Sequence, residues 1–188
     1  MSHVAIQQLG ATWCDVRHVA SYCKTISQIE GMKQRIGIFV GSFDPFTLGH
    51  DSVVRRALPL FDRLVIGVVG DHVSKPNLTP AAERVGAISR LYAGEPRVEV
   101  RSYYGLAVEL AREVGAEFIV KGVRSVKDFE YERDQADINR QLTGIETLLL
   151  YAEPQLSALS SSMVRELAHF GVDVSPYLPG SVDMKNEK

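Results

Sequence analysis

The sequence contains few cysteines and no excess of basic residues. Its two cysteines, Cys14 and Cys23, both lie within the first 33 residues, and no Cys/His cluster elsewhere has the spacing of a zinc site. This pattern favours a reducing, cytoplasmic setting without a disulfide framework. Lys and Arg total 21 against 23 Asp and Glu, so the formal net charge is −2. That balance argues against binding to long nucleic acids, because proteins that bind them usually present a strongly basic face.

Long apolar runs are also absent. No stretch reaches the roughly 20 apolar residues that a membrane helix needs, and the first residues lack the basic, apolar and small-residue order of a signal peptide. We therefore expect neither membrane insertion nor secretion. With 188 residues and 45% apolar content, the chain can form one globular domain that buries about two thirds of its unfolded surface.

Short β-branched runs alternate with segments of helical periodicity from Gln34 onward. The pattern predicts strands over residues 35–40, 63–70, 97–102, 117–122 and 147–152, and helices over residues 51–58, 81–92, 105–115, 127–144 and 161–171. Such alternation is typical of a single α/β domain with a Rossmann-like, doubly wound parallel sheet. We interpret residues 1–33 as an N-terminal extension of unknown role, residues 34–180 as the domain, and residues 181–188 as a C-terminal tail.

Several positions should begin or end these helices. Thr47 is expected to cap a helix that starts near Leu48, and Thr79, followed by a proline, is expected to cap the next one. Pro59 should end the first helix. Gly115 and Gly144 should close two later helices, because glycine tolerates the left-handed backbone found at helix ends.

Polar clusters follow four of the predicted strands. Ser42 to His50 follow the first, Lys75 follows the second, Lys121 to Arg124 accompany the end of the fourth, and Ser160 to Ser162 follow the fifth. The carboxyl ends of parallel strands meet at one edge, where ligands of such sheets bind. Because the clusters supply ammonium, guanidinium, imidazole and hydroxyl groups with few carboxylates, we expect this edge to bind a polyphosphate.

The stretch FVGSFDPFTLGH, residues 39–50, combines a tight turn with a helix start. Gly41 permits close approach of the backbone to a ligand, and the Phe-Asp-Pro segment after Ser42 shapes the turn. His50 falls in the first helical turn, where free N–H groups attract phosphate and an imidazole can stabilise charge that develops during displacement at phosphorus. The structural alternative for His50 is a purely capping role. Asp44 could be a metal ligand or a base, but beside a proline an aspartate more often organises a turn.

Three motifs together resemble those of one enzyme family. GSFDPFTLGH resembles the (T/S)xGH motif of the nucleotidyltransferase superfamily, KGVRSVKDFEYERDQADINR closely resembles the RGxRxxxDFEYExxxAxxNR signature of phosphopantetheine adenylyltransferase, and LSSSMVRE is similar to that family's ISSSxVRE motif. The resemblance covers residues 35–179. It implies adenylyl transfer from ATP to 4′-phosphopantetheine, which gives dephospho-coenzyme A and pyrophosphate in coenzyme A biosynthesis, with Mg²⁺ bound mainly through the ATP phosphates.

The same resemblance implies roles for individual residues. Ser42 would contact the phosphates of both substrates, and His50 would hold the nucleotide phosphate in the transition state. Lys75 and Lys121 would bind the phosphate of phosphopantetheine, and Ala107 would contact its arm. The ATP site would be formed by Ser42, Phe43, His50, Gly122, Val123, Arg124, Glu132, Leu156, Ser157, Ala158, Leu159, Ser160, Ser161 and Ser162. No residue is assigned as a direct metal ligand.

The chain departs from the family pattern at Lys121, where many members have arginine, and at Leu156, where some have an aromatic residue. The DFEYE stretch also allows a structural reading, with Phe129 and Tyr131 as core or interface residues and Glu130 and Glu132 as a solvated face. Since members of this family are commonly hexamers inhibited by coenzyme A, the resemblance implies a homo-oligomer and feedback by coenzyme A.

Two other functions remain as alternatives. One is a nicotinamide-mononucleotide adenylyltransferase, which shares a similar last motif but lacks the DFEYE stretch. The other is a noncatalytic nucleotide-binding protein with the same fold. The DFEYE stretch favours pantetheine over the mononucleotide, and the intact set of Ser42, His50, Lys75, Lys121 and Arg124 favours catalysis.

Overall fold

A five-stranded parallel sheet forms the centre of the computed structural model, which describes residues 34–70 and 78–180. The strands run in the order β3-β2-β1-β4-β5, with the bounds β1 Ile36–Gly41, β2 Arg63–Val69, β3 Val98–Tyr103, β4 Phe118–Val123 and β5 Glu146–Tyr151. The first strand, β1, lies in the middle of the sheet. The chain then moves outward through β2 to β3 and returns to place β4 beside β1. This doubly wound parallel arrangement confirms the predicted fold class.

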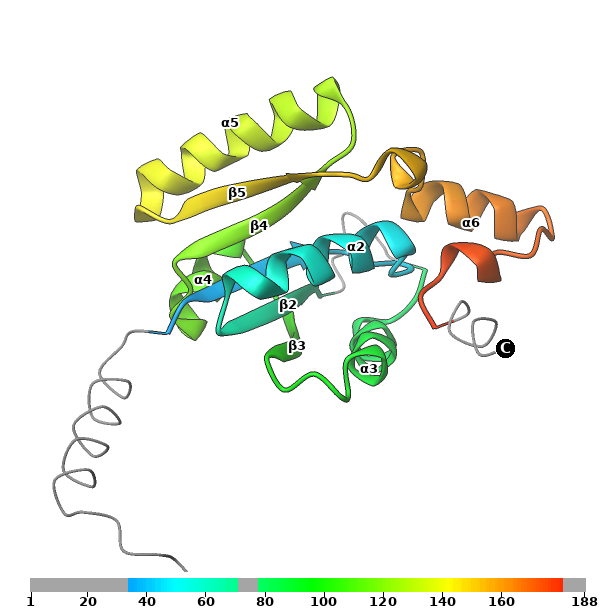
Figure 1. The fold of residues 1–188 in the computed structure, drawn as a ribbon, viewed down its shortest axis with the longest axis horizontal. Helices are drawn as coiled ribbons and strands as arrows, with labels where there is room; N and C mark the ends of the chain where they lie inside the picture. The colour runs from blue at the N-terminus through cyan, green and yellow to red at the C-terminus, as the bar shows by residue number, and fades with distance from the viewer. Residues whose placement is uncertain (1–33, 71–77, 181–188) are drawn as a thin grey trace, which may run out of the picture. The chain divides into compact units, whose positions relative to one another are not determined.

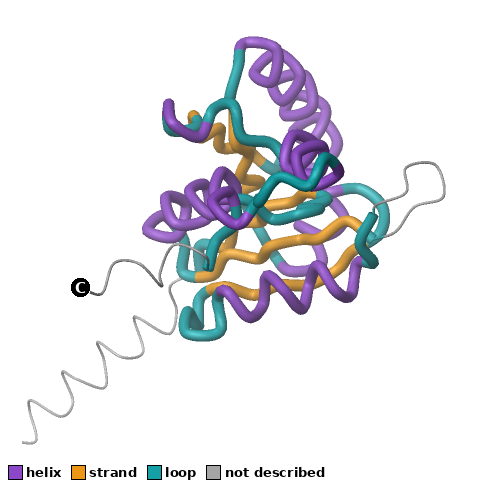
Figure 2. The backbone as a smooth tube through the Cα atoms, turned by 90° about the vertical axis from the view of Figure 1, so that its right-hand side faces the viewer, coloured by secondary structure: helices purple, strands orange, loops and turns teal. Residues whose placement is uncertain are grey.

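Helices flank both faces of the sheet (Figures 1 and 2). Their bounds are α2 Leu48–Ala57, α3 Ala81–Leu91, α4 Ala107–Val114, α5 Val126–Thr143 and α6 Ser161–His169, with short 3₁₀ turns at Leu58–Leu60, Pro154–Leu156 and Ser175–Tyr177. In the described part of the chain, none of these helices has the length and apolar character needed to cross a membrane. The predicted extension and tail, and Lys75, lie outside the described residues.

The ends of most helices match the local signals in the sequence. Thr47 is the N-cap residue of α2, and α2 gives way at Ala57 to the 3₁₀ turn that contains Pro59. Gly115 and Gly144 follow α4 and α5 with φ angles of 72° and 73°, the left-handed conformation that glycine adopts at little cost.

The prediction that Thr79 caps α3 is wrong. The N-cap residue of α3 is Pro80, and no side-chain hydrogen bond caps this helix. Thr79 instead contributes its main chain: its N–H donates to the Asp44 carboxylate, 35 residues away, and its carbonyl accepts from Arg84 Nε of α3 at 2.8 Å. The local Thr-Pro signal is therefore overridden by tertiary hydrogen bonds of the segment that enters the helix.

The core consists of two clusters, one on each face of the sheet. Phe39 and Ile66 pack in a cluster that includes residues of α2 and α3, whereas Ile38 and Val65 pack in a second cluster with residues of α4. Neighbouring strand residues point to opposite faces, and both faces are covered, so the central strands are apolar throughout. None of the residues of α5 is fully buried, so this helix and the edge strand β5 form the most exposed part of the sheet structure.

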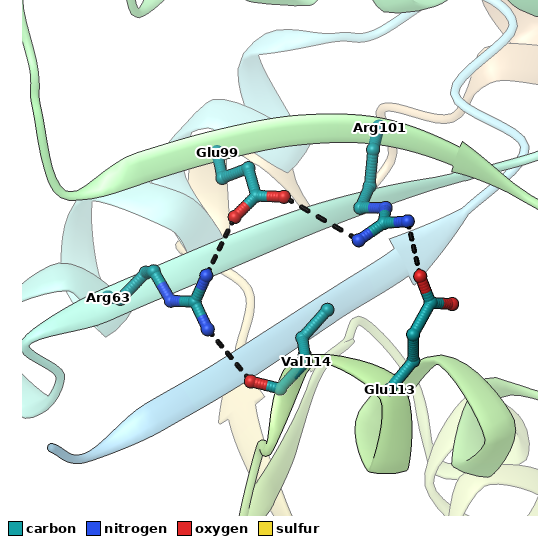
Figure 3. Close-up of polar contacts among 5 residues, drawn as sticks. All are labelled: Arg63, Glu99, Arg101, Glu113 and Val114. Atoms are coloured by element: carbon teal, nitrogen blue, oxygen red, sulfur yellow. Dashed lines mark hydrogen bonds and ion pairs between the residues drawn. The ribbon is translucent and has the colours of Figure 1, made fainter.

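Charged side chains of β2 and β3 contact one another on the side of the sheet where α4 lies (Figure 3). Glu99 accepts from Arg63 at 2.9 Å and lies 3.8 Å from Arg101, and Arg101 also pairs with Glu113 of α4 at 2.5 Å. Arg63 further donates to the Val114 carbonyl at 2.8 Å. These side chains are partly exposed, so each pair contributes little stability, but together they attach α4 to the edge of the sheet.

Candidate active site

A cavity of about 550 Å³ lies at the carboxyl ends of β1 and β4. From β1 the chain continues through α2 to β2 on one side, and from β4 it continues through α5 to β5 on the other side, while α6 begins beside the same edge (Figure 1). Such a switch in chain direction leaves a crevice in an open α/β sheet. Most of the predicted site residues line this cavity: Ser42, Phe43, His50, Lys121, Gly122, Arg124, Glu132, Leu156, Leu159, Ser160, Ser161 and Ser162.

Four predicted site residues do not line the cavity. Val123 is buried at the end of β4. Ala107 begins α4 and packs against the core cluster on the α4 face. Ser157 and Ala158 are exposed in the segment between β5 and α6, where the Ser157 hydroxyl donates to the Pro154 carbonyl. Their predicted substrate contacts therefore stay predictions.

The ring of His50 is held on two sides at the start of α2. Its Nδ1 accepts the Thr47 main-chain N–H at 3.0 Å, and the rings of Phe43 and Phe46 pack against it at centroid distances of 5.1 and 5.4 Å. Since a main-chain N–H can only donate, the neutral imidazole carries its proton on Nε2. His50 thus has a capping role through Nδ1, and its Nε2–H is left as the donor for a ligand.

The electrostatic surroundings keep this imidazole neutral. Burial, and secondly the positive charge of Arg124, lower the pKa of His50 to about 4. Near pH 7 the side chain is therefore a neutral hydrogen-bond donor rather than an imidazolium ion. A group of this kind can stabilise negative charge that develops on a phosphate oxygen without undergoing proton transfer itself.

Two cations at the end of β4 are paired with carboxylates of α5. Lys121 Nζ lies 3.1 Å from Glu132 Oε2, and Arg124 Nε lies 3.0 Å from Asp128 Oδ2. Asp128 and Glu132 are one turn apart on α5, and all four side chains line the cavity. The cavity therefore presents cations whose charge is partly balanced and whose positions are restrained before any anion binds.

The amino-terminal end of α6 also meets the cavity. Ser160 caps the helix by accepting the Met163 N–H at 3.1 Å, and Ser161 donates to the Pro45 carbonyl at 2.9 Å. Unpaired N–H groups and the helix dipole make such an end favourable for phosphate. Ser160 therefore caps the helix, and Ser161 holds its positive end against the turn after β1 at the cavity.

Buried polar contacts hold the turn after β1. The carboxylate of Asp44, which is 4% exposed, accepts the Leu78 N–H at 2.7 Å. Arg84, which is 3% exposed, donates to the carbonyls of Ser42 at 2.5 Å and Val69 at 3.0 Å. The turn is thereby tied to the end of β2 and the start of α3, which gives Asp44 the structural role considered from the sequence.

Sequence reasoning did not assign two charged residues that line the cavity, Asp128 and Arg165. Arg165 donates to the main-chain carbonyl of Asp44 and to Ser162 Oγ, the latter at 3.2 Å. Both belong to the motifs DFEYE and LSSSMVRE. Helical spacing could have identified them, because Asp128 lies four residues after Arg124 and Arg165 lies three residues after Ser162.

The cavity carboxylates bear on how a metal ion would be held. Within the described ranges, no group of three or more His, Cys, Asp or Glu side chains is placed to bind a metal ion. Asp44 accepts main-chain N–H groups, while Asp128 and Glu132 pair with cations. These carboxylates are thus engaged by main-chain N–H groups or by cations and do not form a dedicated metal cage within the described residues.

Comparisons with known proteins agree on one family. Residues 38–167 match the cytidylyltransferase-like family. The chain is 53% identical to phosphopantetheine adenylyltransferase from Phocaeicola vulgatus over 77% of its own length and 95% of the relative. It is 50% identical to the phosphopantetheine adenylyltransferase of Bacteroides fragilis, over 80% of this chain and 99% of the relative.

Solved structures share the fold at much lower sequence identity. A protein from Vibrio parahaemolyticus, assigned as a nicotinate-nucleotide adenylyltransferase, has a TM-score of 0.59 and 19% identity, over 81% of this chain and 97% of that one. A bifunctional NMN adenylyltransferase/ADP ribose pyrophosphatase from Francisella tularensis has a TM-score of 0.57 and 15% identity, over 78% of this chain and 45% of that one. At these identities the likeness shows the fold alone.

Proposed function

The chain belongs to the phosphopantetheine adenylyltransferase family, and we propose that its cavity is where the two substrates of that reaction meet. As a member of the family it transfers the adenylyl group of ATP to 4′-phosphopantetheine, giving dephospho-coenzyme A and pyrophosphate. The observation that carries the assignment of the site is the convergence of His50, Lys121, Arg124 and the first turn of α6 on one cavity.

The ATP phosphates are proposed to bind between His50, Arg124 and the start of α6. His50 offers Nε2–H, Arg124 offers its guanidinium, and Ser160 to Ser162 surround the positive end of a helix dipole. Arg165, which already reaches the same turn, adds a second guanidinium. These groups supply the charge and the donors that a triphosphate needs at one side of the cavity.

The phosphate of phosphopantetheine is proposed to bind at Lys121, with Lys75 as a second ligand by family resemblance. Lys121 keeps three N–H donors, so it can hold Glu132 and a phosphate oxygen at the same time. The pairing restrains a flexible ammonium group and orients it toward the cavity. Lysine here binds as a point charge, without the bidentate geometry of an arginine.

The proposed mechanism is a displacement at the α-phosphorus of ATP. A phosphate oxygen of phosphopantetheine forms a bond to that phosphorus, the bond from phosphorus to the bridging oxygen breaks, and pyrophosphate leaves with the electron pair. The attacking phosphate is largely ionised near pH 7, so no protein nucleophile or general base is needed. The side chains hold the two anions in line, and His50 stabilises the charge that grows on the α-phosphate.

Magnesium is proposed as the metal of this reaction, bound mainly through the phosphates of ATP. When bound, it would neutralise charge on the phosphate oxygens and on the leaving group. The carboxylates of Asp128 and Glu132 are engaged by cations, so the chain would contribute the cationic surroundings, with the remaining positions of the ion filled by water, and no residue is assigned as its direct ligand.

A homo-oligomer is proposed by family resemblance, with a hexamer as the expected form. Support comes from an exposed apolar stripe on α5, formed by Tyr131, Ile138 and Leu142, which are 62%, 55% and 57% exposed. Their spacing of seven and four residues places them on one face of the helix. Light scattering should find an oligomer that Ile138→Lys with Leu142→Lys dissociates, while Phe170→Lys at the end of α6 does not. A monomeric wild-type protein would contradict the proposal.

Feedback by coenzyme A is proposed from the family resemblance. A cytoplasmic location is proposed from the low cysteine content of the chain. Coenzyme A combines an adenylate and a pantetheine arm, so it can occupy both halves of the cavity and compete with the substrates.

A pyrophosphate-release assay tests the proposed reaction and its site together. With ATP, Mg²⁺ and 4′-phosphopantetheine the protein should release pyrophosphate, and with nicotinamide mononucleotide as the acceptor it should not. Arg124→Ala should lose turnover, whereas Arg97→Ala, at an exposed arginine outside the cavity lining, should keep wild-type activity. This pair of results would support the cavity as the site. Turnover with the mononucleotide alone would overturn the pantetheine assignment.

A further inference from the structure

Arg124 is fixed at the cavity by three hydrogen bonds to two residues from different segments. Asp128 Oδ2 accepts both the Arg124 side-chain Nε–H at 3.0 Å and the Arg124 main-chain N–H at 3.3 Å. The Leu159 carbonyl, from the segment before α6, accepts from Nη1 at 3.4 Å. One carboxylate oxygen therefore holds the arginine at its main chain and again near the end of its side chain.

The capping of α5 does not account for this arrangement. Ser125 is the N-cap residue, and its hydroxyl accepts the Asp128 N–H at 3.1 Å. In the common reciprocal arrangement, the carboxylate at the third helical position would return to the N–H of the capping residue. Here the carboxylate of Asp128 reaches one residue further back, to Arg124. Its hydrogen bonds are thus directed at the arginine rather than at the helix end.

Folding stability does not account for it either. The side chains of Arg124 and Asp128 are 40% and 29% exposed and are spaced i,i+4 on the surface of the cavity. Ion pairs of this kind contribute little to folding. Restricting a long side chain matters more where a ligand must meet a guanidinium in one orientation, because positioning errors of about 1 Å can reduce rates on the order of 100-fold.

We propose that Asp128 is a positioning residue for adenylyl transfer, which acts by holding the Arg124 guanidinium at the place where it receives the ATP phosphates. The Nη2 group of Arg124 has no hydrogen-bond partner among the contacts of the described residues, so its two N–H donors remain for a ligand in the cavity. Asp128 is proposed to act through the arginine and not as a phosphate ligand, because a carboxylate and a phosphate repel each other. The inference rests on the proposed role of Arg124 in binding ATP.

A double-mutant cycle tests this proposal in the full-length protein. Asp128→Ala should lower kcat/KM for ATP by about 10- to 100-fold, with little change in the KM for phosphopantetheine and in the melting temperature. Asp128→Asn, which keeps an acceptor oxygen but loses the charge, should fall between Asp128→Ala and wild type. Arg124→Ala should cost at least as much as Asp128→Ala. In the Arg124→Ala background, adding Asp128→Ala should cause no further loss.

Asp137→Ala is the matched control. Asp137 pairs with Arg140 on the same helix at 3.8 Å, and both side chains are well exposed. The change removes the same charge from α5, and kcat/KM should stay at the wild-type value.

The outcomes separate the inference from the proposed function. If Arg124→Ala lowers kcat/KM and Asp128→Ala lowers it by the same factor with and without Arg124, Asp128 does not act through the arginine and the inference fails alone. A loss in Asp128→Ala that follows a fall in melting temperature also overturns it, because the role is then structural. If Arg124→Ala has wild-type kinetics, the proposed role of Arg124 and the inference both fail.

Discussion

Replacing His50 by asparagine separates the two functions that the structure gives this ring. The amide oxygen of asparagine can occupy the region of Nδ1 and accept the Thr47 N–H, which the imidazole accepts at 3.0 Å. Asparagine has no atom that reaches the position of Nε2. His50→Ala removes both the acceptor and the donor. The comparison therefore distinguishes a residue that only caps α2 from one that also stabilises the transition state.

The structure allows the size of each effect to be estimated. Both variants should lose kcat by about 10²- to 10³-fold, the usual cost of removing one preorganised donor, with a smaller effect on ATP binding. His50→Ala should also lose a helix-capping contact worth about 0.5–2 kcal/mol. For a domain of this size, each kcal/mol corresponds to a change of about 2–4 °C in melting temperature. His50→Asn should melt close to wild type.

The pH dependence of kcat tests the protonation state. Because the pKa of His50 is about 4, only about one ring in a thousand is protonated at pH 7. A neutral donor predicts that the ionisation of His50 leaves kcat unchanged between about pH 5.5 and 8. If kcat falls as the pH rises, with a midpoint near pH 6.5 in wild type but not in His50→Asn, imidazolium is the active form and the reasoning is wrong. Full kcat in His50→Asn would likewise refute a catalytic role.

Further predictions follow from the same site. Since folding lowers the pKa of His50, the unfolded chain binds more protons between about pH 4 and 6.5, so stability should fall as pH falls through that window in denaturant titrations, and less so in His50→Asn. Lys121→Ala should weaken phosphopantetheine by about 10- to 100-fold in calorimetry and affect ATP less; the opposite pattern would reverse the two assigned sites. EDTA should stop turnover and added Mg²⁺ should restore it, whereas turnover that persists in EDTA would contradict the proposed metal. A chain that starts at Met32 should keep its melting temperature and turnover, because the family match begins at residue 38; loss of folded protein would show that the extension is required.

The sequence predicted the fold well because its patterns are local. Apolar runs, glycines after helices and the spacing of apolar residues are set within a few neighbours, and they placed all five strands and the five helices from α2 to α6 close to their observed bounds. The prediction of Thr79 as a cap failed for the opposite reason. Its main-chain N–H donates to Asp44, 35 residues away in the chain, and no local pattern reveals that contact.

The sequence by itself also determined which residues could meet, because polar clusters at the ends of parallel strands converge on one edge, and its motifs indicated the family and the reaction. Only the tertiary structure decided the protonation and the orientation of those residues. The proton on His50 Nε2 depends on the contact with Thr47 and on burial against Phe43 and Phe46. The geometry of the turn depends on partners far along the chain, with Asp44 bonded 34 residues away to Leu78 and 121 residues away to Arg165. Such contacts form only when the sheet brings distant segments together, so the orientation and charge of the site residues follow from the folded structure and not from spacing.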